Sequence, residues 1–314
     1  MKDEVNGNKK GGFGDAPELK QYDSLQEAIR DLFGNERSVV SSRSVSGGDI
    51  NEARALRLDD GTVLFMKANQ ARSIGNFLAE ARGIRAIAAT GAIGTPRILG
   101  AGVDGSRSFL LMEYITGRSR IAGYWAVFAH ELARMHRAST DPEIGFGFSS
   151  DNYIGSSAQI NTPCESWISF FRSCRLEPQF RAAAGYFDAG DLRRIAFLLD
   201  HLERYLTEPS APSLLHGDLW AGNVITGNDG KAWLIDPAVY YGHPEADLAM
   251  TELFGGFPGT FYDAYREDAG LDPGYADRRD LYNLYQLLNH LNLFGGGYLP
   301  SVDRILRRYA GNGR

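Results

Sequence analysis

The chain contains only two cysteines, Cys164 and Cys174, among 314 residues. Two thiols cannot form a zinc site by themselves, and no residues with metal-ligand spacing stand beside them. The count would allow one disulfide. Isolated thiols are more typical of a reducing compartment, so we expect them to be free and the protein to be cytoplasmic.

Long apolar runs are also missing. No segment approaches the roughly 20 apolar residues of a membrane-spanning helix, so we expect no membrane partner. The opening stretch, MKDEVNGNKKGGFGD, is polar and lacks the apolar core of a signal peptide, and we interpret residues 1–20 as a mobile tail. With 43% hydrophobic and 23% charged residues, the remainder has the composition of an ordinary globular protein.

An excess of positive charge is absent as well. The chain has 33 Lys and Arg against 39 Asp and Glu, a net charge of −6. Residues 1–117 carry 15 of each sign, so the acidic excess lies in residues 118–314, with 18 basic and 24 acidic side chains. This balance disfavours nucleic acid as a partner. It mildly favours a cationic or amine-bearing ligand, but a solvated acidic surface is the more common cause of such an excess.

Hydrophobic periodicity divides the ordered chain into two parts. Residues 21–115 are expected to form a small lobe of antiparallel strands, and residues 116–314 a larger, mostly helical lobe. In the first lobe we expect a helix starting near Ser24, strands at 53–58 and 62–67, a helix at 74–89, and a hairpin around 97–114. In the second we expect a hairpin around 224–235 and helices at 123–138, 167–176, 191–206, 245–254 and 280–294. The predicted class is a two-lobed α+β fold with a ligand site in the cleft between the lobes.

Glu80 occupies an unusual position in the helix predicted at 74–89. It lies on the same face as Phe77 and Ile84, which should pack inward. A buried carboxylate is costly unless it is paired, and Lys67, at the end of the strand TVLFMK, is the expected partner. The alternative is that Glu80 reaches water at the edge of this face and Lys67 simply ends a strand.

A glycine-containing loop, SGGDIN (residues 46–51), precedes the first strand pair. Gly47 and Gly48 would let backbone N–H groups approach phosphates, although a plain turn has the same composition. The sequence has no G-x-x-x-x-G-K-[ST] motif, which excludes a P-loop fold. A glycine loop, a strand lysine and a helix glutamate follow one another in the ATP clamp of kinases.

The stretch LLHGDLWAGNVI (residues 214–225) has the H-x-D-x-x-x-x-N spacing of a kinase catalytic loop. Asn223 directly precedes the predicted hairpin and Asp236 directly follows it. Antiparallel neighbours are only about 5 Å apart, so these two side chains should lie side by side, and their oxygens suit Mg²⁺. Chance Asn and Asp residues at turns are the alternative. The spacing predicts Asp218 as a general base, with Asn223 and Asp236 as metal ligands.

Together with WLIDPAVYYGHPEADLAM, this loop resembles the fructosamine kinase (ketosamine-3-kinase) family, a branch of the aminoglycoside-phosphotransferase-like group with a protein-kinase-like fold. The segments SGGDINEARAL, LLMEY, ELARMHRAS and DNYIGSSAQIN extend the resemblance from about Ser24 to the C-terminus. Two departures from protein kinases matter. Pro237 and Ala238 follow Asp236 in place of Phe-Gly, and no Ala-Pro-Glu motif is present. Pro237 predicts an extended Asp236 that cannot swing, as expected of a constitutively active small-substrate kinase.

The resemblance implies phosphorylation, dependent on ATP and Mg²⁺, of the 3-hydroxyl of a ketosamine such as fructosamine or ribulosamine, free or attached to protein, and a role in deglycation. It implies that Lys67 contacts the ATP phosphates and pairs with Glu80. Backbone groups of Met112, Glu113, Tyr114 and Ile115 would bind adenine. The side chains facing the substrate would be Gln159, Asn161 and Trp220.

Other interpretations of the function remain open. The first is another small-molecule kinase of this fold, acting on choline, an aminoglycoside or homoserine, and the second is a nucleotide-binding pseudokinase. A structural metal-binding module is more remote. We expect structural roles for His136 and His216 and a bracing role for Asp247. The sequence leaves His243, Glu245 and the oligomeric state open.

Overall fold

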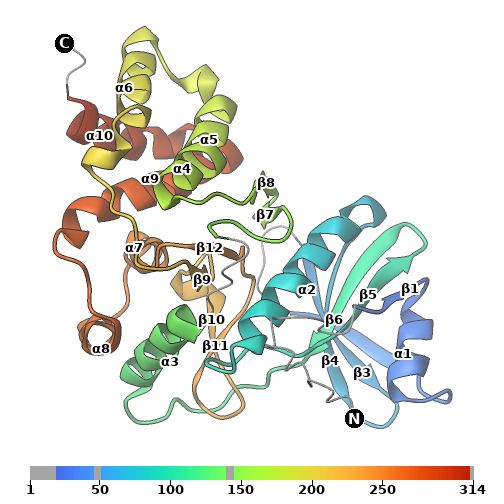
Figure 1. The fold of residues 1–314 in the computed structure, drawn as a ribbon. Coiled ribbons are helices and arrows are strands. Elements are labelled where there is room, and N and C mark those ends of the chain that lie inside the picture. Colours follow the sequence, from blue (N-terminus) through green and yellow to red (C-terminus); the bar gives the residue numbers. More distant parts are fainter. Residues whose placement is uncertain (1–18, 46–50, 139–144, 312–314) are drawn as a thin grey trace, which may run out of the picture.

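A computed structural model describes residues 19–45, 51–138 and 145–311 of the chain. Figure 1 shows a sheet lobe built from the first part of the chain and a helical lobe built from the rest. The predicted glycine-loop residues Gly47 and Gly48, and most of the predicted tail, lie outside the described residues. Cys164 and Cys174 are both free thiols, as expected.

The sheet lobe contains a six-stranded sheet in the order β1-β5-β6-β4-β3-β2. Its strands are β1 (Gln21–Tyr22), β2 (Val39–Ser44), β3 (Glu52–Leu58), β4 (Val63–Gln70), β5 (Ile98–Asp104) and β6 (Arg107–Glu113). All neighbours are antiparallel except β1, which runs parallel to β5. The two predicted hairpins, β3–β4 and β5–β6, are present. Strand β2 was not predicted because it is an exposed edge strand without apolar alternation.

Two helices cover opposite faces of this sheet. Helix α1 (Leu25–Phe33) starts at the predicted cap, where the Ser24 hydroxyl accepts the N–H of Glu27 at 3.1 Å. It packs in a core with Phe109 and Leu111 of β6, whereas α2 (Ile74–Ala89) packs with Leu110 and Met112. Successive strand residues point to opposite faces, so α1 and α2 lie on different sides of the sheet.

The helical lobe differs from the sequence expectation in several bounds. Its helices are α3 (Tyr124–Ala138), α4 (Trp167–Phe170), α5 (Glu177–Ala182), α6 (Ala189–Leu199), α7 (Glu245–Leu253), α8 (Gly259–Ala269), α9 (Tyr275–Phe294) and α10 (Leu299–Ala310). Helix α6 starts earlier than predicted because Asp188 and Asp191 form a capping box, and it ends at Leu199 rather than at 206. Helices α5, α8 and α10 were not predicted. The predicted helix at 167–176 continues beyond α4 as a π-helix, Phe171–Leu176.

Three short strand pairs organise the region between the lobes. They are β7 (Asn152–Ile154) with β8 (Ser157–Gln159), β9 (Ser213–Leu215) with β12 (Tyr240–Gly242), and the predicted hairpin of β10 (Val224–Thr226) with β11 (Ala232–Leu234). The segments leaving β9 and β11 carry the predicted catalytic and metal residues. These pairings therefore decide where the site lies.

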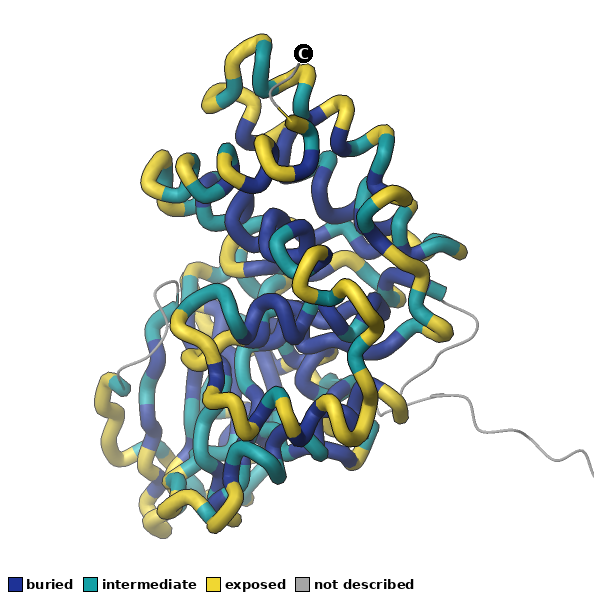
Figure 2. Tube along the Cα trace, turned by 90° about the vertical axis from the view of Figure 1, so that its left-hand side faces the viewer, coloured by how far each residue is buried: buried dark blue, intermediate teal, exposed yellow. Residues whose placement is uncertain are grey.

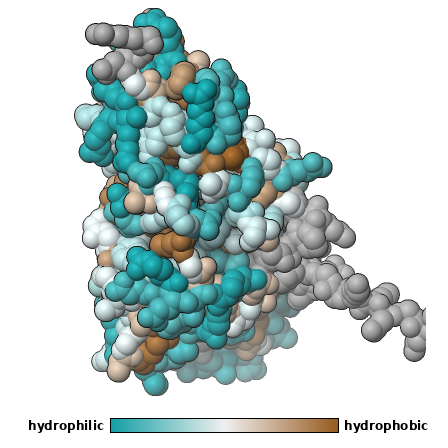
Figure 3. All heavy atoms as spheres, turned by 60° about the vertical axis from the view of Figure 1, so that its left-hand side comes forward, coloured by the Kyte–Doolittle hydropathy of each residue, from teal (hydrophilic) through white to brown (hydrophobic). Residues whose placement is uncertain are grey.

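Apolar faces of the helices and strands are buried in the core, and their polar faces form the surface. Figure 2 shows buried chain through the middle of both lobes and exposed chain on outer loops and helix faces. The face drawn in Figure 3 is mainly hydrophilic, with hydrophobic side chains in small separate groups. Within the described ranges, no helix combines the length and apolar character that crossing a bilayer requires.

Candidate active site

The loop between β9 and β10 is fixed from the helical lobe by Asp247 of α7. The Asp247 carboxylate, which is 1% exposed, accepts the backbone N–H of His216 at 2.7 Å and that of Gly217 at 2.9 Å. The same carboxylate lies 3.2 Å from Nε2 of His136, whose Nδ1 lies 2.7 Å from the hydroxyl of Tyr265. Asp247 therefore braces the loop, and His136 is a satisfied core histidine, both as predicted.

His216 connects this loop to the segment that precedes Asp236. Its Nδ1 accepts the N–H of Asp218 at 3.2 Å, so Nε2 carries the proton and donates to the carbonyl of Ile235 at 2.9 Å. Complete burial lowers the pKa of His216, which keeps the ring neutral at physiological pH. The structural role predicted for His216 is confirmed.

Gly217 allows the two segments to approach at backbone distance. The N–H of Ala238 donates to the carbonyl of His216 at 2.8 Å. Gly217 has φ +81°, and a Cβ there would lie 2.0 Å from the carbonyl oxygen of Ala238. Only glycine fits this position, because a side chain would separate the loop from the segment after Asp236.

Asp218 and Asn223 are in direct contact. The amide nitrogen of Asn223 donates to the Asp218 carboxylate at 2.9 Å and to the Asp218 carbonyl at 2.8 Å. Both amide hydrogens are thus used within the loop, which leaves the amide oxygen as the atom able to bind a cation. Burial raises the pKa of Asp218 to about 7, the Asn223 hydrogen bond opposes this shift, and the charges of Asp236 and Asp247 add to it.

Asp236 follows the hairpin where the sequence places it, but its backbone differs from the prediction. Val224 pairs with Leu234, and the N–H of Ile235 donates to the carbonyl of Asn223 at 3.1 Å, so Ile235 lies opposite Asn223 and Asp236 is the next residue along the chain. The expected extended conformation is wrong: Asp236 has φ +54°. Pro237 disfavours the right-handed helical region for Asp236, and the chain turns sharply through the left-handed region instead. Such backbone is uncommon outside glycine and is concentrated at functional sites.

Lys67 joins the sheet lobe to this region. Its Nζ lies 2.7 Å from Glu80, which confirms the predicted ion pair, and 2.5 Å from Asp236. Burial alone would lower the pKa of Lys67, but the charges of Glu80 and Asp236 outweigh it, so the amine stays protonated. Burial raises the pKa of Glu80 to about 6 against the attraction of Lys67.

Gln159 and Asn161, which the resemblance implies as substrate residues, are buried and hydrogen-bonded within the protein. Each is only 1% exposed. The Gln159 amide donates to the carbonyl of Ala238 at 3.0 Å and to Asn152 at 2.7 Å, and its oxygen accepts the hydroxyl of Tyr285 at 2.7 Å. The Asn161 amide likewise donates to Asn152 at 2.9 Å.

Arg175, in the π-helix, anchors this buried network and was missed from the sequence. It is 0% exposed, donates to the Asn161 oxygen at 2.7 Å, and lies 3.9 Å from the ring centroid of Tyr240. The network thus supports the Ala238 carbonyl and the segment after Asp236. The sequence did contain a signal for this role, because Arg175 lies among apolar residues in FFRSCRL and a buried arginine needs hydrogen-bond acceptors. The sequence does not show which residues supply those acceptors.

The remaining predicted site residues are Met112, Glu113 and Tyr114, at and just after the end of β6, and Trp220, in the loop after β9. Met112 is buried in β6, and the N–H of the adjacent Glu113 donates to the Arg97 carbonyl at 3.0 Å, so that N–H is not available to a ligand. The Tyr114 hydroxyl accepts from Arg43 at 2.9 Å. Trp220 lies in the catalytic loop and is 39% exposed.

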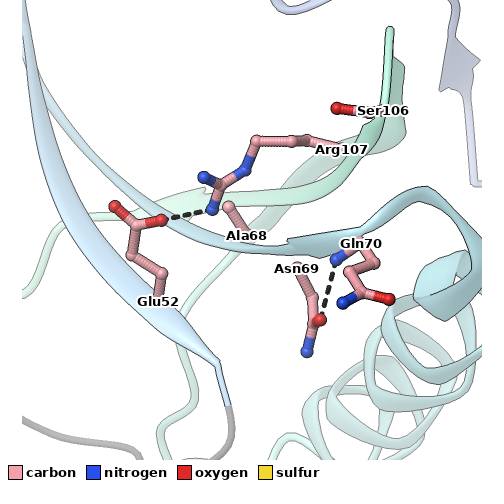
Figure 4. A pocket seen from close by; sticks show the side chains of 6 residues that line it. All are labelled: Glu52, Ala68, Asn69, Gln70, Ser106 and Arg107. Carbon is pink, nitrogen blue, oxygen red and sulfur yellow. Dashed lines mark hydrogen bonds and ion pairs between the residues drawn. The ribbon is translucent and has the colours of Figure 1, made fainter.

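A pocket of about 570 Å³ lies elsewhere, at a corner of the sheet formed by β3, β4 and β6. Figure 4 shows the Arg107 guanidinium directed at the Glu52 carboxylate, while Asn69 accepts the N–H of Gln70 on the other side of the strand. The charges lining this pocket therefore compensate each other. None of the predicted catalytic or metal residues lines it.

The sheet with its Lys67–Glu80 pair and the helical lobe with its catalytic loop define a phosphotransferase with a protein-kinase-like fold. A solved aminoglycoside phosphotransferase, in ternary complex with AMP-PNP and hygromycin B, superimposes with a TM-score of 0.60 at 19% identity, covering 91% of this chain and 99% of that one. This likeness confirms the predicted fold class.

Within that class, the chain belongs to the fructosamine kinase family, whose model matches residues 21–311. A probable ketoamine kinase from Synechocystis sp. is 38% identical over 288 residues, 91% of this chain and 96% of the relative. The chloroplastic protein-ribulosamine 3-kinase of Arabidopsis thaliana is 39% identical over 283 residues, 88% and 84% of the two chains. The crystal structure of a fructosamine-3-kinase candidate from Haemophilus somnus has a TM-score of 0.81 at 27% identity, covering 91% and 96%.

These matches confirm the predicted family and identify the chain as a phosphotransferase of the fructosamine/ketosamine 3-kinase type. The plant relative is chloroplastic, so membership of the family does not fix the compartment. Cytoplasmic localisation therefore stays a prediction.

Proposed function

We propose that this protein transfers the terminal phosphate of ATP, with Mg²⁺, to the 3-hydroxyl of a ketosamine such as fructosamine or ribulosamine. The observation that carries the proposal is the Asp218 carboxylate, hydrogen-bonded to Asn223 at 2.9 Å in a loop braced by Asp247. The names of the relatives, ketoamine kinase and ribulosamine 3-kinase, support the substrate class, and AMP-PNP in the aminoglycoside phosphotransferase supports the nucleotide. We also propose that this reaction serves in deglycation.

Asp218 acts as the general base. A carboxylate whose pKa is near 7 can take a proton from the attacking hydroxyl while remaining largely ionised at slightly alkaline pH. Its hydrogen bond to Asn223 fixes the orientation of the acceptor oxygen. Positioning of this kind supplies much of the rate in phosphoryl transfer, because the transition state is loose.

Asn223 and Asp236 hold Mg²⁺. The Asn223 amide oxygen is free of the hydrogen bonds made by its nitrogen, and the Asp236 side chain is 36% exposed with one oxygen on Lys67. Two oxygen ligands suit Mg²⁺, which fills its shell with water and phosphate oxygens and neutralises phosphate charge when bound.

The sheet lobe, residues 21–115, binds the nucleotide. Lys67, oriented by Glu80, contacts the phosphates, and backbone groups of residues 112–115 contact adenine. Residues 116–314 supply the base, the metal ligands and Trp220, whose exposed ring stacks on the sugar.

The test is a panel of acceptors offered to the purified protein with Mg·ATP, read by the mass shift of phosphate addition. The panel contains lysine adducts of glucose, ribose and erythrose, together with choline, homoserine and an aminoglycoside. We expect phosphate only on the ketosamines. Transfer only to choline, homoserine or the aminoglycoside would refute the substrate class, and ATP binding without any acceptor would favour a pseudokinase.

A further inference from the structure

A series of aromatic side chains in contact leads from the catalytic loop across the helical lobe. We call it the aromatic stripe, and its members are Trp220 of the loop, Phe254 after α7, His290 and Phe294 of α9, and Tyr298 before α10. Ring centroids are 6.4 Å apart from Trp220 to Phe254, 4.9 Å from Phe254 to His290, and 5.5 Å from His290 to Phe294. Tyr298 lies 5.2 Å from His290.

The stripe lies at the surface. Phe294 is 57% exposed and Trp220 39%, while the other three rings are half-buried. Single exposed aromatic residues are common, but five rings in contact, drawn from separate elements, form the kind of surface that binds a partner. The core of the helical lobe is built from other aromatic rings, such as those of Trp167 and Phe171, which are almost completely buried. The rings of the aromatic stripe are therefore not needed to fill this core.

Helix α9 fixes the stripe relative to the catalytic loop. The Gln286 amide donates to the carbonyl of Gly217 at 2.9 Å, next to Asp218. One turn further along, Nδ1 of His290 donates to the carbonyl of Gln286 at 2.8 Å, which leaves Nε2 of His290 as an acceptor on the stripe. A ligand held at Asp218 and extending over the stripe would therefore meet a rigid surface.

We propose that the aromatic stripe binds the polypeptide flanking a glycated lysine whose sugar lies at Asp218. The inference rests on the proposed function and adds to it the surface that recognises the carrier of the ketosamine. The stripe starts at Trp220, whose backbone N–H donates to the carbonyl of Asp218 at 3.1 Å, so it begins next to the proposed site of transfer. It also extends well beyond Trp220, the ring assigned to the sugar.

The chemistry of the stripe fits this occupant. Aromatic faces bind the methylene groups of a lysine side chain and attract the ammonium of the ketosamine linkage. The His290 acceptor can receive a peptide N–H. The acidic excess of residues 118–314 favours lysine-rich segments.

The experiment compares two substrates that carry the same ketosamine. One is the adduct of Nα-acetyl-lysine amide, and the other is a decapeptide with that adduct at a central lysine. Phosphate transfer is measured for the unaltered enzyme, for Phe294→Ala and for Tyr298→Ala. Phe197→Ala is the matched control, because Phe197 is 38% exposed and stacks on His201 at 4.3 Å but lies on α6, outside the stripe.

We expect the unaltered enzyme to have a lower KM for the peptide. Phe294→Ala and Tyr298→Ala should each raise KM for the peptide about tenfold, the size of a moderate interface contact, and leave kcat and the small adduct unchanged. Phe197→Ala should change neither substrate. Equal KM values for both substrates, or a peptide preference that survives both stripe variants, would overturn the proposal. Failure of the unaltered enzyme to phosphorylate either adduct would instead refute the proposed function, and the stripe assignment with it.

Discussion

Lys67 and Asp236 are 169 residues apart in the sequence, yet the lysine Nζ lies 2.5 Å from the aspartate carboxylate. Lys67 belongs to β4 of the sheet lobe and Asp236 follows β11 in the helical lobe, so this ion pair joins the two lobes. The same ammonium also binds Glu80 at 2.7 Å. One buried cation is thus shared by a carboxylate of the sheet lobe and a carboxylate proposed to hold Mg²⁺.

Lys67→Met should both destabilise the fold and end turnover. It leaves Glu80 buried without its cation, and removing one partner of a buried pair costs about 3–5 kcal/mol. The double variant Lys67→Met/Glu80→Gln should regain much of that stability, because the uncompensated charge is gone, and stay inactive. Denaturant unfolding and phosphate transfer measure the two effects. Full stability of Lys67→Met alone would show that the ion pair does not support the fold.

Asp247→Ala should lower kcat more than it changes KM for ATP. The carboxylate touches no reacting atom but accepts the N–H groups of His216 and Gly217, and each buried donor left unpaired costs about 1–3 kcal/mol. Asp218 would then be poorly positioned. Asp263→Ala is the control, since that side chain is 72% exposed and pairs only locally with Arg266. If the two substitutions had equal effects on kcat, Asp247 would not be needed to hold the loop that carries Asp218.

The dependence of the transfer rate on Mg²⁺ concentration should show whether Asn223 is a metal ligand. Chelation with EDTA should abolish transfer, and added Mg²⁺ should restore it. Asn223→Ala removes the amide oxygen proposed as a ligand, so we expect the Mg²⁺ concentration for half-maximal rate to rise about tenfold or more. Asn228→Ala is a control on the same hairpin, where the side chain contacts Thr116 instead. An unchanged Mg²⁺ titration for Asn223→Ala would remove it from the ligand set.

His243 should make stability fall in mild acid. Burial, followed by the nearby charge of Arg278, lowers the pKa of His243 to about 4 in the folded protein, against roughly 6.5 when unfolded. The unfolded chain therefore binds more protons between these values, so stability is fully present above pH 6.5 and is lost as the pH falls to 4. The loss amounts to roughly 3 kcal/mol at 1.36 kcal/mol per pKa unit.

The check is chemical unfolding across this pH range for the unaltered protein and for His243→Asn. Asparagine retains an oxygen that can accept the Glu245 N–H, which His243 now accepts through Nδ1 at 3.2 Å. The stability curve of His243→Asn should be flatter between pH 6.5 and 4. Parallel curves for the two proteins would assign the acid sensitivity to other groups.

Features set by nearby residues were predictable from the sequence. The helix predicted at 74–89 is observed as Ile74–Ala89, and the Lys67–Glu80 pair follows from one charge on an apolar helix face and another on an apolar strand. The hairpin β10–β11 was predicted from its turn residues, and its register places Ile235, the residue before Asp236, opposite Asn223. In each case the residues that form the pattern belong to one element or to elements that are close together in the sequence.

Side-chain roles that depend on distant partners were not predictable. The resemblance implies that Gln159 and Asn161 face the substrate, but it does not reveal their buried partners Tyr285 and Arg175, which come from other parts of the chain. The second partner of Lys67 was missed for the same reason. Helix α8 escaped prediction because its polar residues give a weak apolar pattern, and packing against α3 stabilises it instead.

The central claim is that Asp218 removes the proton from the hydroxyl that attacks ATP. Phosphate transfer by Asp218→Asn to a lysine ketosamine, measured beside ATP binding and the unfolding midpoint of the same preparation, tests this claim most directly. We predict ATP binding and stability close to those of the unaltered protein, with transfer reduced about a thousandfold or more. Transfer at a near-normal rate by a folded, ATP-binding Asp218→Asn protein would contradict the account.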